Sequence, residues 1–215
     1  MLRIPGALLR PWCTADADAY GRTIRRNEAH LRRFTPWVVD GRVPGVPFRY
    51  RLADFAAAFA SGREWVYGIF PDPPPTRSDD DEPPVLGSAG LYPRVGPRAI
   101  EIGAWLAASA TGRGLATQVA IALVDVAFAS DAIDRVEMRC HPRNVASRRV
   151  PAKLGFRVTV TPTVPAKGLE VWAIERAAWH ETTAVIVRAQ RGAASAVSSR
   201  SVIAYAGRGD ESKRA

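Results

Sequence analysis

The clearest hydrophobic pattern in the chain runs from residue 101 to residue 156. Ile100, Ile102 and Ala104 alternate with polar or small residues, which predicts a strand with one apolar face. After a bend of small residues, apolar positions recur every three or four residues in an alanine-rich segment, which predicts a helix. The alternation resumes over 136–140, and a second helical segment follows. This order of elements predicts a mixed α/β (α+β) domain.

The bend between the first strand and the first helix contains Gly112 and Gly114 on either side of Arg113. Glycines at this point leave backbone N–H groups uncovered and directed along the positive end of the helix dipole, so the bend predicts an anion site. A P-loop is excluded because no Gly-Lys-Ser/Thr follows. A dinucleotide-binding turn is a weaker alternative, because Thr117 replaces the third glycine and the acid Asp134 precedes the next strand.

Two motifs follow each other in this region. Thr111, Gly114 and Ala116 fall on the pattern Q/R-x-x-G-x-G/A, with threonine at its first position, and 144–147 reads N-x-x-S, with K-L-G-F downstream at 153–156. In this order, with a helix and a strand between them, they resemble the two signatures of the GNAT superfamily of N-acetyltransferases. The branch that they resemble is that of the RimJ/RimL ribosomal-protein N-terminal acetyltransferases.

Thinner similarities at 8–11, 27–37 and 170–174 extend the resemblance over about residues 8–180. It implies a GNAT fold, in which helices flank a mixed central sheet of six to seven strands with a splayed acetyl-CoA cleft. We expect the acetyltransferase domain to span 1–183 and the basic segment 184–215 to be a poorly ordered tail. The acidic, proline-rich stretch 71–84 is expected to be a solvated hairpin connection.

The resemblance implies acetyl-CoA as the acetyl donor and no metal. The expected contacts lie at the strand end, in the glycine turn and at the two helix starts: Trp105, Leu106, Ala107, Thr111, Gly112, Arg113, Gly114, Leu115, Ala116, Thr117 and Asn144. Main-chain N–H groups around Trp105 to Ala107 would also stabilise the oxyanion, because a splayed strand leaves donors free. The threonine at 111 removes a side-chain contact to the pyrophosphate, whereas backbone contacts survive the change.

Amine acetylation needs a neutral nucleophile and a proton for the departing thiolate. Glu101 is the candidate base because it lies on the strand that leads into the turn. The alternative interpretation is that Glu101 is an exposed strand residue without a catalytic role. Pro151 stands where many GNAT enzymes carry a tyrosine acid, so the resemblance points to Ser147 instead. Asn144 and Ser147 are equally typical of a helix cap. A proline inside this helix costs roughly 3 kcal/mol, so the helix should start late or be kinked.

Phe34, Trp37 and Trp172 are candidates for the walls of the acceptor pocket, and core packing is the alternative for all three. His30 and His141 are interpreted as packing or surface residues, since nothing positions a partner beside either. The favoured acceptor is the N-terminal α-amine of a protein such as a ribosomal protein. A small-molecule amine (an antibiotic or a polyamine) and a non-catalytic CoA-binding regulatory protein remain as alternatives.

Composition adds a few limits. The 215 residues are 47% hydrophobic, enough for one core, and they contain no apolar run of transmembrane length, so we expect a cytoplasmic protein without a membrane partner. The 2 cysteines are too few for a zinc site, and Cys140 is predicted to be a buried strand residue. The net charge of +9 comes almost entirely from arginines that are not interleaved with aromatics, so no direct nucleic-acid binding is expected. Acidic peptides would still be attracted. The oligomeric state stays open, with a homodimer as one option.

Overall fold

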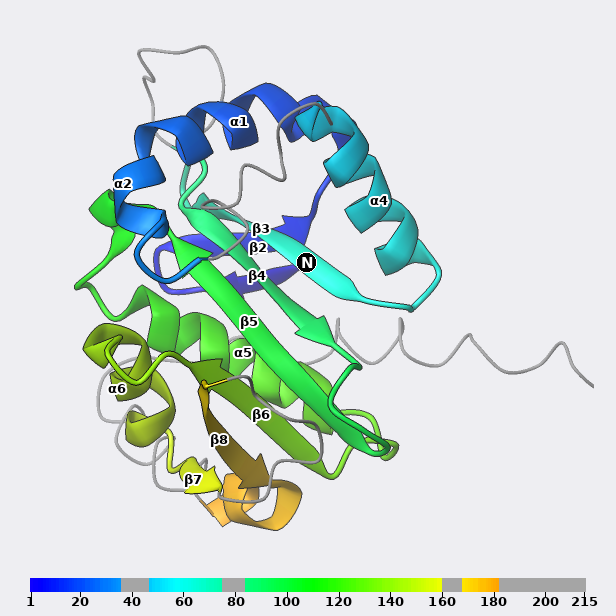
Figure 1. Ribbon diagram of the computed structural model, residues 1–215. Helices are drawn as coiled ribbons and strands as arrows, with labels where there is room; N and C mark the ends of the chain where they lie inside the picture. Colours follow the sequence, from blue (N-terminus) through cyan, green and yellow to red (C-terminus); the bar gives the residue numbers. More distant parts are fainter. Residues whose placement is uncertain (36–46, 75–83, 160–167, 182–215) are drawn as a thin grey trace, which may run out of the picture.

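A computed structural model describes residues 1–35, 47–74, 84–159 and 168–181. The predictions for Trp37, for most of the 71–84 connection and for the 184–215 tail lie outside these residues. Within them the chain forms one sheet of 8 strands in the order β1-β2-β3-β4-β5-β6-β8-β7 (Figure 1). The strands are β1 Leu2–Ile4, β2 Ala7–Pro11, β3 Trp65–Pro71, β4 Gly87–Tyr92, β5 Ala99–Leu106, β6 Arg135–Cys140, β7 Arg157–Thr159 and β8 Glu170–Glu175.

The prediction of a mixed α/β sheet is confirmed, although the sheet has more strands than the six to seven expected. The difference comes from the edges, where β1 and β7 are only 3 residues long and give little periodic signal. Neighbouring strands pair antiparallel except β5 and β6, which pair parallel. A parallel pair needs a crossover connection, and the helix predicted after the glycine bend provides it.

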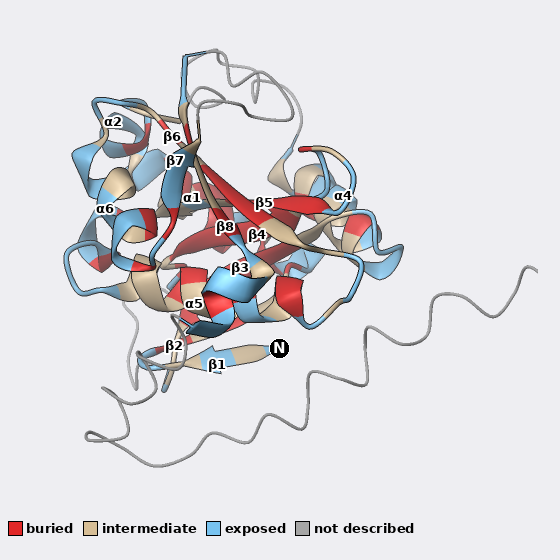
Figure 2. Cartoon of the chain, turned by 90° about the horizontal axis from the view of Figure 1, so that it is seen from below, coloured by how far each residue is buried: buried red, intermediate tan, exposed pale blue. Residues whose placement is uncertain are grey.

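Helices cover both faces of the sheet. The described helices are η1 Thr14–Asp16, α1 Ala17–Arg26, α2 Glu28–Leu31, α4 Phe48–Ala60, η2 Ala108–Ala110, α5 Leu115–Phe128 and α6 Val145–Lys153. On one face α5 packs against a core cluster that includes Ile100 and Ile102 of β5 and Val136 of β6. On the other face α1 and α4 enclose a second cluster around Trp12 and Tyr20. Buried residues accordingly concentrate in the central strands and in α5 (Figure 2).

The two central parallel strands separate part-way along their length. The β5–β6 ladder runs only from the pair Ala99–Arg135 to the pair Ile102–Met138. Beyond it, β5 continues to Leu106 paired with β4 alone, and β6 continues to Cys140 paired with β8 alone. The sheet therefore opens into a V whose walls are the ends of β5 and β6, which confirms the expected splay.

Candidate active site

One wall of the V consists of the end of β5, η2 and the glycine turn that leads into α5. Gly112 and Gly114 adopt left-handed backbone angles (φ 77° and 80°), which other residues adopt only at a cost. A Cβ at either glycine would meet no heavy atom within 4 Å, so the turn is open on its outer side. Gly114 is the N-cap of α5 and has no side chain to cap the first amides of the helix.

The chain just before this turn is tied to neighbouring elements. The N–H of Ala107 donates to the carbonyl of Leu86 at 2.8 Å. The N–H of Ala108 donates to Oδ1 of Asn27, at the end of α1, at 2.8 Å. The Thr111 hydroxyl donates to the carbonyl of Ala108 at 2.7 Å. These bonds fix the path from the β5 end into η2.

The other wall is the end of β6 and the first turn of α6. Oδ1 of Asn144, the N-cap of α6, accepts a hydrogen bond from the N–H of Ser147 at 3.1 Å. The Ser147 hydroxyl in turn lies 3.2 Å from Sγ of Cys140, as its hydrogen-bond donor. Cys140 is only 3% exposed, and burial raises the pKa of its thiol. The predicted burial of Cys140 is therefore confirmed, and its sulfur is a contact of the Ser147 hydroxyl.

Pro151 lies inside α6 and is buried. The helix does not start late, because it begins at Val145 immediately after its cap. A proline at position 151 has no N–H to donate to the carbonyl four residues earlier, which is that of Ser147. The first turn of α6 thus lacks one helical hydrogen bond at the residue that carries the candidate acid.

The segment around α2 contacts both walls. Asn27 holds η2 on the β5 side, and Nδ2 of Asn27 donates to the carbonyl of Thr23 at 2.9 Å, which fixes the orientation of its amide. On the β6 side, the Phe34 ring lies 5.6 Å from the His141 ring, centroid to centroid. Both views show α2 and α6 at the same end of the molecule (Figures 1 and 2). This segment therefore spans the mouth of the V.

A network of ion pairs joins the two strands where they are still paired. Oε1 and Oε2 of Glu101 accept hydrogen bonds from Nη2 and Nε of Arg94 at 2.8 and 3.1 Å. Nε of Arg139 lies 3.6 Å from Glu101, and Nη2 of Arg139 donates to Glu137 at 3.3 Å. Glu137 is fully buried and also accepts from Nε of Arg135 at 3.0 Å. Glu101 is 7% exposed, so the alternative of an exposed strand residue is wrong.

Comparison with known proteins identifies the family. The family model described as "Acetyltransferase (GNAT) domain" matches residues 7–157. The chain belongs to the GNAT acetyltransferase family. The probable N-acetyltransferase YjcK of Bacillus subtilis (strain 168) is 27% identical over 158 residues, which is 73% of this chain and 83% of that protein. The family assignment therefore confirms the predicted N-acetyltransferase class.

Solved structures agree on the fold. RimJ of Mycobacterium smegmatis, in complex with CoA-disulfide, superposes with a TM-score of 0.62 at 24% identity, over 83% of this chain and 88% of that one. RimL, a ribosomal L7/L12 α-N-protein acetyltransferase in complex with coenzyme A, gives 0.64 at 19% identity, over 80% and 95%. Ribosomal-protein-S5-alanine acetyltransferase from Vibrio fischeri gives 0.62 at 17% identity, over 83% and 97%. These neighbours support the predicted RimJ/RimL-like architecture.

In this GNAT domain the backbone of the β5 end limits which amides can face the V. The Ala107 amide already donates to the carbonyl of Leu86, which directly precedes β4. Because hydrogen-bonding groups alternate between the two edges of a strand, the amide of Trp105 also points to β4, whereas that of Leu106 points toward β6. Of the three expected oxyanion donors, the Leu106 N–H is the one directed into the opening.

The aromatic candidates for the acceptor wall fall in different places. Phe34 contacts His141 at the mouth, whereas Trp172 packs against the core cluster on the α5 side of the sheet. Its indole N–H donates to Glu170 at 3.2 Å. Core packing therefore accounts for Trp172. Nδ1 of His141 accepts from the N–H of Arg143 at 3.1 Å, and His30 is exposed.

Five residues of the site were not predicted from the sequence: Asn27, Arg94, Arg139, Glu137 and Glu170. The charged residues at alternate positions 135, 137 and 139 of a central strand were a usable signal, because such a strand is otherwise apolar on both faces. Asn27 began a recognised motif without an assigned role. Arg94 carried no local signal, since it lies in a hairpin turn and its partner is 7 residues away.

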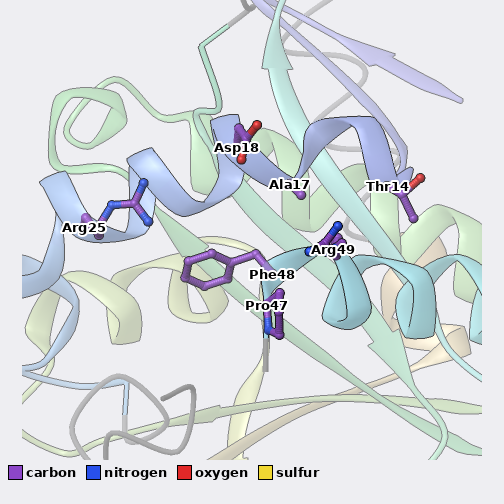
Figure 3. A pocket seen from close by; sticks show the side chains of 7 residues that line it. All are labelled: Thr14, Ala17, Asp18, Arg25, Pro47, Phe48 and Arg49. Atoms are coloured by element: carbon purple, nitrogen blue, oxygen red, sulfur yellow. The ribbon is translucent and has the colours of Figure 1, made fainter. Parts of the chain in front are cut away.

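A separate pocket of about 500 Å³ lies between α1 and the first turn of α4 (Figure 3). It contains none of the predicted site residues and is lined by Thr14, Ala17, Asp18, Arg25, Pro47, Phe48 and Arg49. Among the described residues, no three His, Cys, Asp or Glu side chains gather as metal ligands. No helix in the described part of the chain has the length and hydropathy needed to cross a membrane.

Proposed function

We propose that this acetyltransferase binds acetyl-CoA in the V between β5 and β6 and acetylates the α-amine of a polypeptide N-terminus. The observation that supports this most directly is the left-handed glycine turn, Gly112 to Gly114, at the start of the 14-residue helix α5 beside the parted strands. A helix N-terminus with free amides and no overlying side chain is suited to a pyrophosphate. RimJ and RimL, two structural neighbours, were solved with CoA-disulfide and coenzyme A.

The chemistry assigned to the residues is direct transfer. The amine nitrogen attacks the thioester carbonyl, and the developing oxyanion accepts a hydrogen bond from the Leu106 amide. The carbon–sulfur bond then breaks, and the Ser147 hydroxyl gives its proton to the thiolate. The proton lost by the amine is released through the carboxylate of Glu101 or through water, and solvent restores the serine hydroxyl. The products are an amide and a free thiol.

The surroundings of Glu101 favour an α-amine over a lysine. At pH 7, deprotonating an α-amino group of pKa near 7.8 costs about 1 kcal/mol, and a lysine of pKa near 10.4 costs about 4.6 kcal/mol. Both oxygens of Glu101 already accept hydrogen bonds from Arg94, and Arg139 lies close by. Both carboxylate oxygens are thus already engaged by an arginine. The α-amine makes the smaller demand on such a site, because it is almost neutral already.

The proposal is tested by measuring thiol release from acetyl-CoA with three matched peptides. One has a free N-terminus and no lysine, one has a blocked N-terminus and one lysine, and one has neither amine. We expect turnover with the first only. Turnover with the second alone would contradict the α-amine assignment. Turnover with polyamines or aminoglycosides and with no peptide would favour the small-molecule alternative.

Two variants test the assigned roles. Ser147→Ala should lower kcat by about 100-fold, in the range of a general acid, with the affinity for acetyl-CoA unchanged. Glu101→Gln should lower kcat less at pH 8.5 than at pH 6.5, because fewer acceptor molecules are protonated at the higher pH. A protein that binds acetyl-CoA, releases no thiol with any amine and responds to neither substitution would be a CoA-binding regulator.

A further inference from the structure

The hydroxyl of Ser147 is held by fewer helical bonds than its place in α6 suggests. Asn144 caps the N–H of Ser147, but Pro151 leaves the Ser147 carbonyl without its helical donor. The proline ring also crowds that carbonyl. Helical hydrogen bonds alone therefore do not fully fix the position of Ser147.

Two side chains at the ends of β6 and β8 contact the first turn of α6. Cys140, the last residue of β6, lies opposite Glu170, the first residue of β8, in the antiparallel ladder. Cys140 contacts the Ser147 hydroxyl at 3.2 Å, and Glu170 accepts a hydrogen bond from Nε of the next residue, Arg148, at 2.7 Å. The Glu170 carboxylate is itself fixed, since the same oxygen accepts from the Trp172 indole at 3.2 Å. Two consecutive residues of α6 are thus attached to two paired strand residues.

We propose that Cys140 and Glu170 are positioning residues that hold the Ser147 hydroxyl at the cleft, in place of the helical hydrogen bond that Pro151 removes. This inference rests on the proposed role of Ser147 as the acid. Pro151 has two effects in this interpretation. It stands where other GNAT enzymes carry a tyrosine acid, and it also removes a helical hydrogen bond at Ser147, the residue that would act as the acid instead.

The thiol of Cys140 suits this role chemically. Because burial raises its pKa, Cys140 keeps its hydrogen at neutral pH. A hydroxyl hydrogen rotates freely about its C–O bond, so the serine can donate to the cysteine sulfur at rest. When negative charge develops on a departing thiolate, the hydroxyl can turn to it while the cysteine S–H donates to the serine oxygen. No bond to Cys140 forms or breaks.

The test is a double-mutant cycle on kcat. Cys140→Ala and Glu170→Gln are each measured in the natural background and in the Ser147→Ala background, with thermal unfolding and acetyl-CoA affinity as folding checks. We expect each to lower kcat by about 5- to 10-fold in the natural background, the size of one hydrogen bond, and by less than about 2-fold when Ser147 is absent. Cys140→Ser, which replaces the thiol by a hydroxyl that can also donate and accept, should lose less kcat than Cys140→Ala.

Pro151→Ala provides an independent readout, because it restores the missing N–H. Combined with Cys140→Ala it should return kcat toward the natural value, which a purely structural role for the cysteine would not explain. Cys13→Ala and Glu175→Gln are the matched controls and should leave kcat unchanged, since Cys13 is exposed near η1 and Glu175 lies at the opposite end of β8.

The outcomes separate the inference from the proposed function. If Ser147→Ala lowers kcat and Cys140→Ala does not, the inference fails and the acid role stands. An equal loss from Cys140→Ala with and without Ser147 would also overturn the inference, because the cysteine would then act on the fold. If Ser147→Ala leaves kcat unchanged while peptides are acetylated, the acid role and this inference both fail, and acetyl transfer to α-amines stands.

Discussion

The two walls of the V are built by different means. On the β5 side the groups proposed to contact acetyl-CoA are backbone amides, which are placed by the left-handed Gly112 and Gly114 and by the start of α5. On the β6 side they are side chains, placed by a cap, a buried thiol and a carboxylate below α6. The difference teaches where a sequence can depart from its family pattern at low cost.

The two departures from the family pattern illustrate this. Thr111 replaces a glutamine or arginine on the backbone wall, and its hydroxyl bonds inside the turn to the Ala108 carbonyl at 2.7 Å. The amides of the turn remain available. Pro151 replaces a tyrosine on the side-chain wall, and there it removes both a candidate acid and a helical hydrogen bond. In the proposed mechanism the acid role on that side then falls to Ser147.

The strongest test of the backbone wall is Gly114→Val. A β-branched residue in the left-handed region costs about 1–2 kcal/mol of stability, and its side chain would enter the open space on the outer side of the turn. We expect acetyl-CoA affinity to fall by more than about 10-fold, measured by calorimetry. Gly62→Val is the matched control, because Gly62 is also left-handed (φ 69°) but lies in the turn between α4 and β3. Equal losses of affinity in both variants would contradict a ligand-specific role.

The next largest effect is expected where the walls meet. Glu101→Gln leaves Arg94 and Arg139 without their shared carboxylate, so we expect a loss of about 1–2 kcal/mol in the free energy of unfolding. Chemical denaturation measures it. Glu175→Gln removes a carboxylate that lies 3.5 Å from Arg135 and is 58% exposed, and it should change stability by less than about 0.5 kcal/mol. An unchanged stability for Glu101→Gln would mean that the network does not join the strands energetically.

On the side-chain wall, Asn144→Ala should have a moderate effect. Loss of an N-cap costs about 1 kcal/mol, and here it also releases the Ser147 amide. We expect kcat to fall by about 5-fold, as measured by thiol release, and Asn144→Asp to restore most of it because aspartate is an equally good cap. Full activity of Asn144→Ala would show that the cap does not position Ser147.

The smallest effect expected is at the buried thiol. Because burial raises the pKa of Cys140 above that of a free cysteine, its thiolate fraction at pH 8 is lower in the folded protein and grows only at higher pH. Iodoacetamide should therefore modify the exposed Cys13 and spare Cys140, as read by peptide mass spectrometry. Both should react in denaturant. Rapid modification of Cys140 in the folded protein would contradict its description as an enclosed, neutral contact of Ser147.

Sequence reasoning succeeded where a local pattern decides the structure. The alternation at 100–104 and the glycine bend predicted β5, the turn and α5, because period and backbone freedom are properties of adjacent residues. It was less successful where partners are distant. The bond from Asn27 to Ala108 joins residues 81 positions apart, and Trp172 packs on the α5 side because of its register opposite Met138. Neither follows from a local pattern.

The short ladder between β5 and β6 has a mechanical consequence. Strands β1 to β5 form one antiparallel unit and β6, β8 and β7 form another, and between them run the 4 residue pairs from Ala99 to Ile102, with two further bonds to the Arg98 carbonyl. These paired residues form a seam between the two units, and a motion that separates the units to widen the cleft strains the hydrogen bonds of this seam. Hydrogen exchange of the seam amides, compared with those of the β2–β3 ladder, would therefore report breathing of the cleft directly.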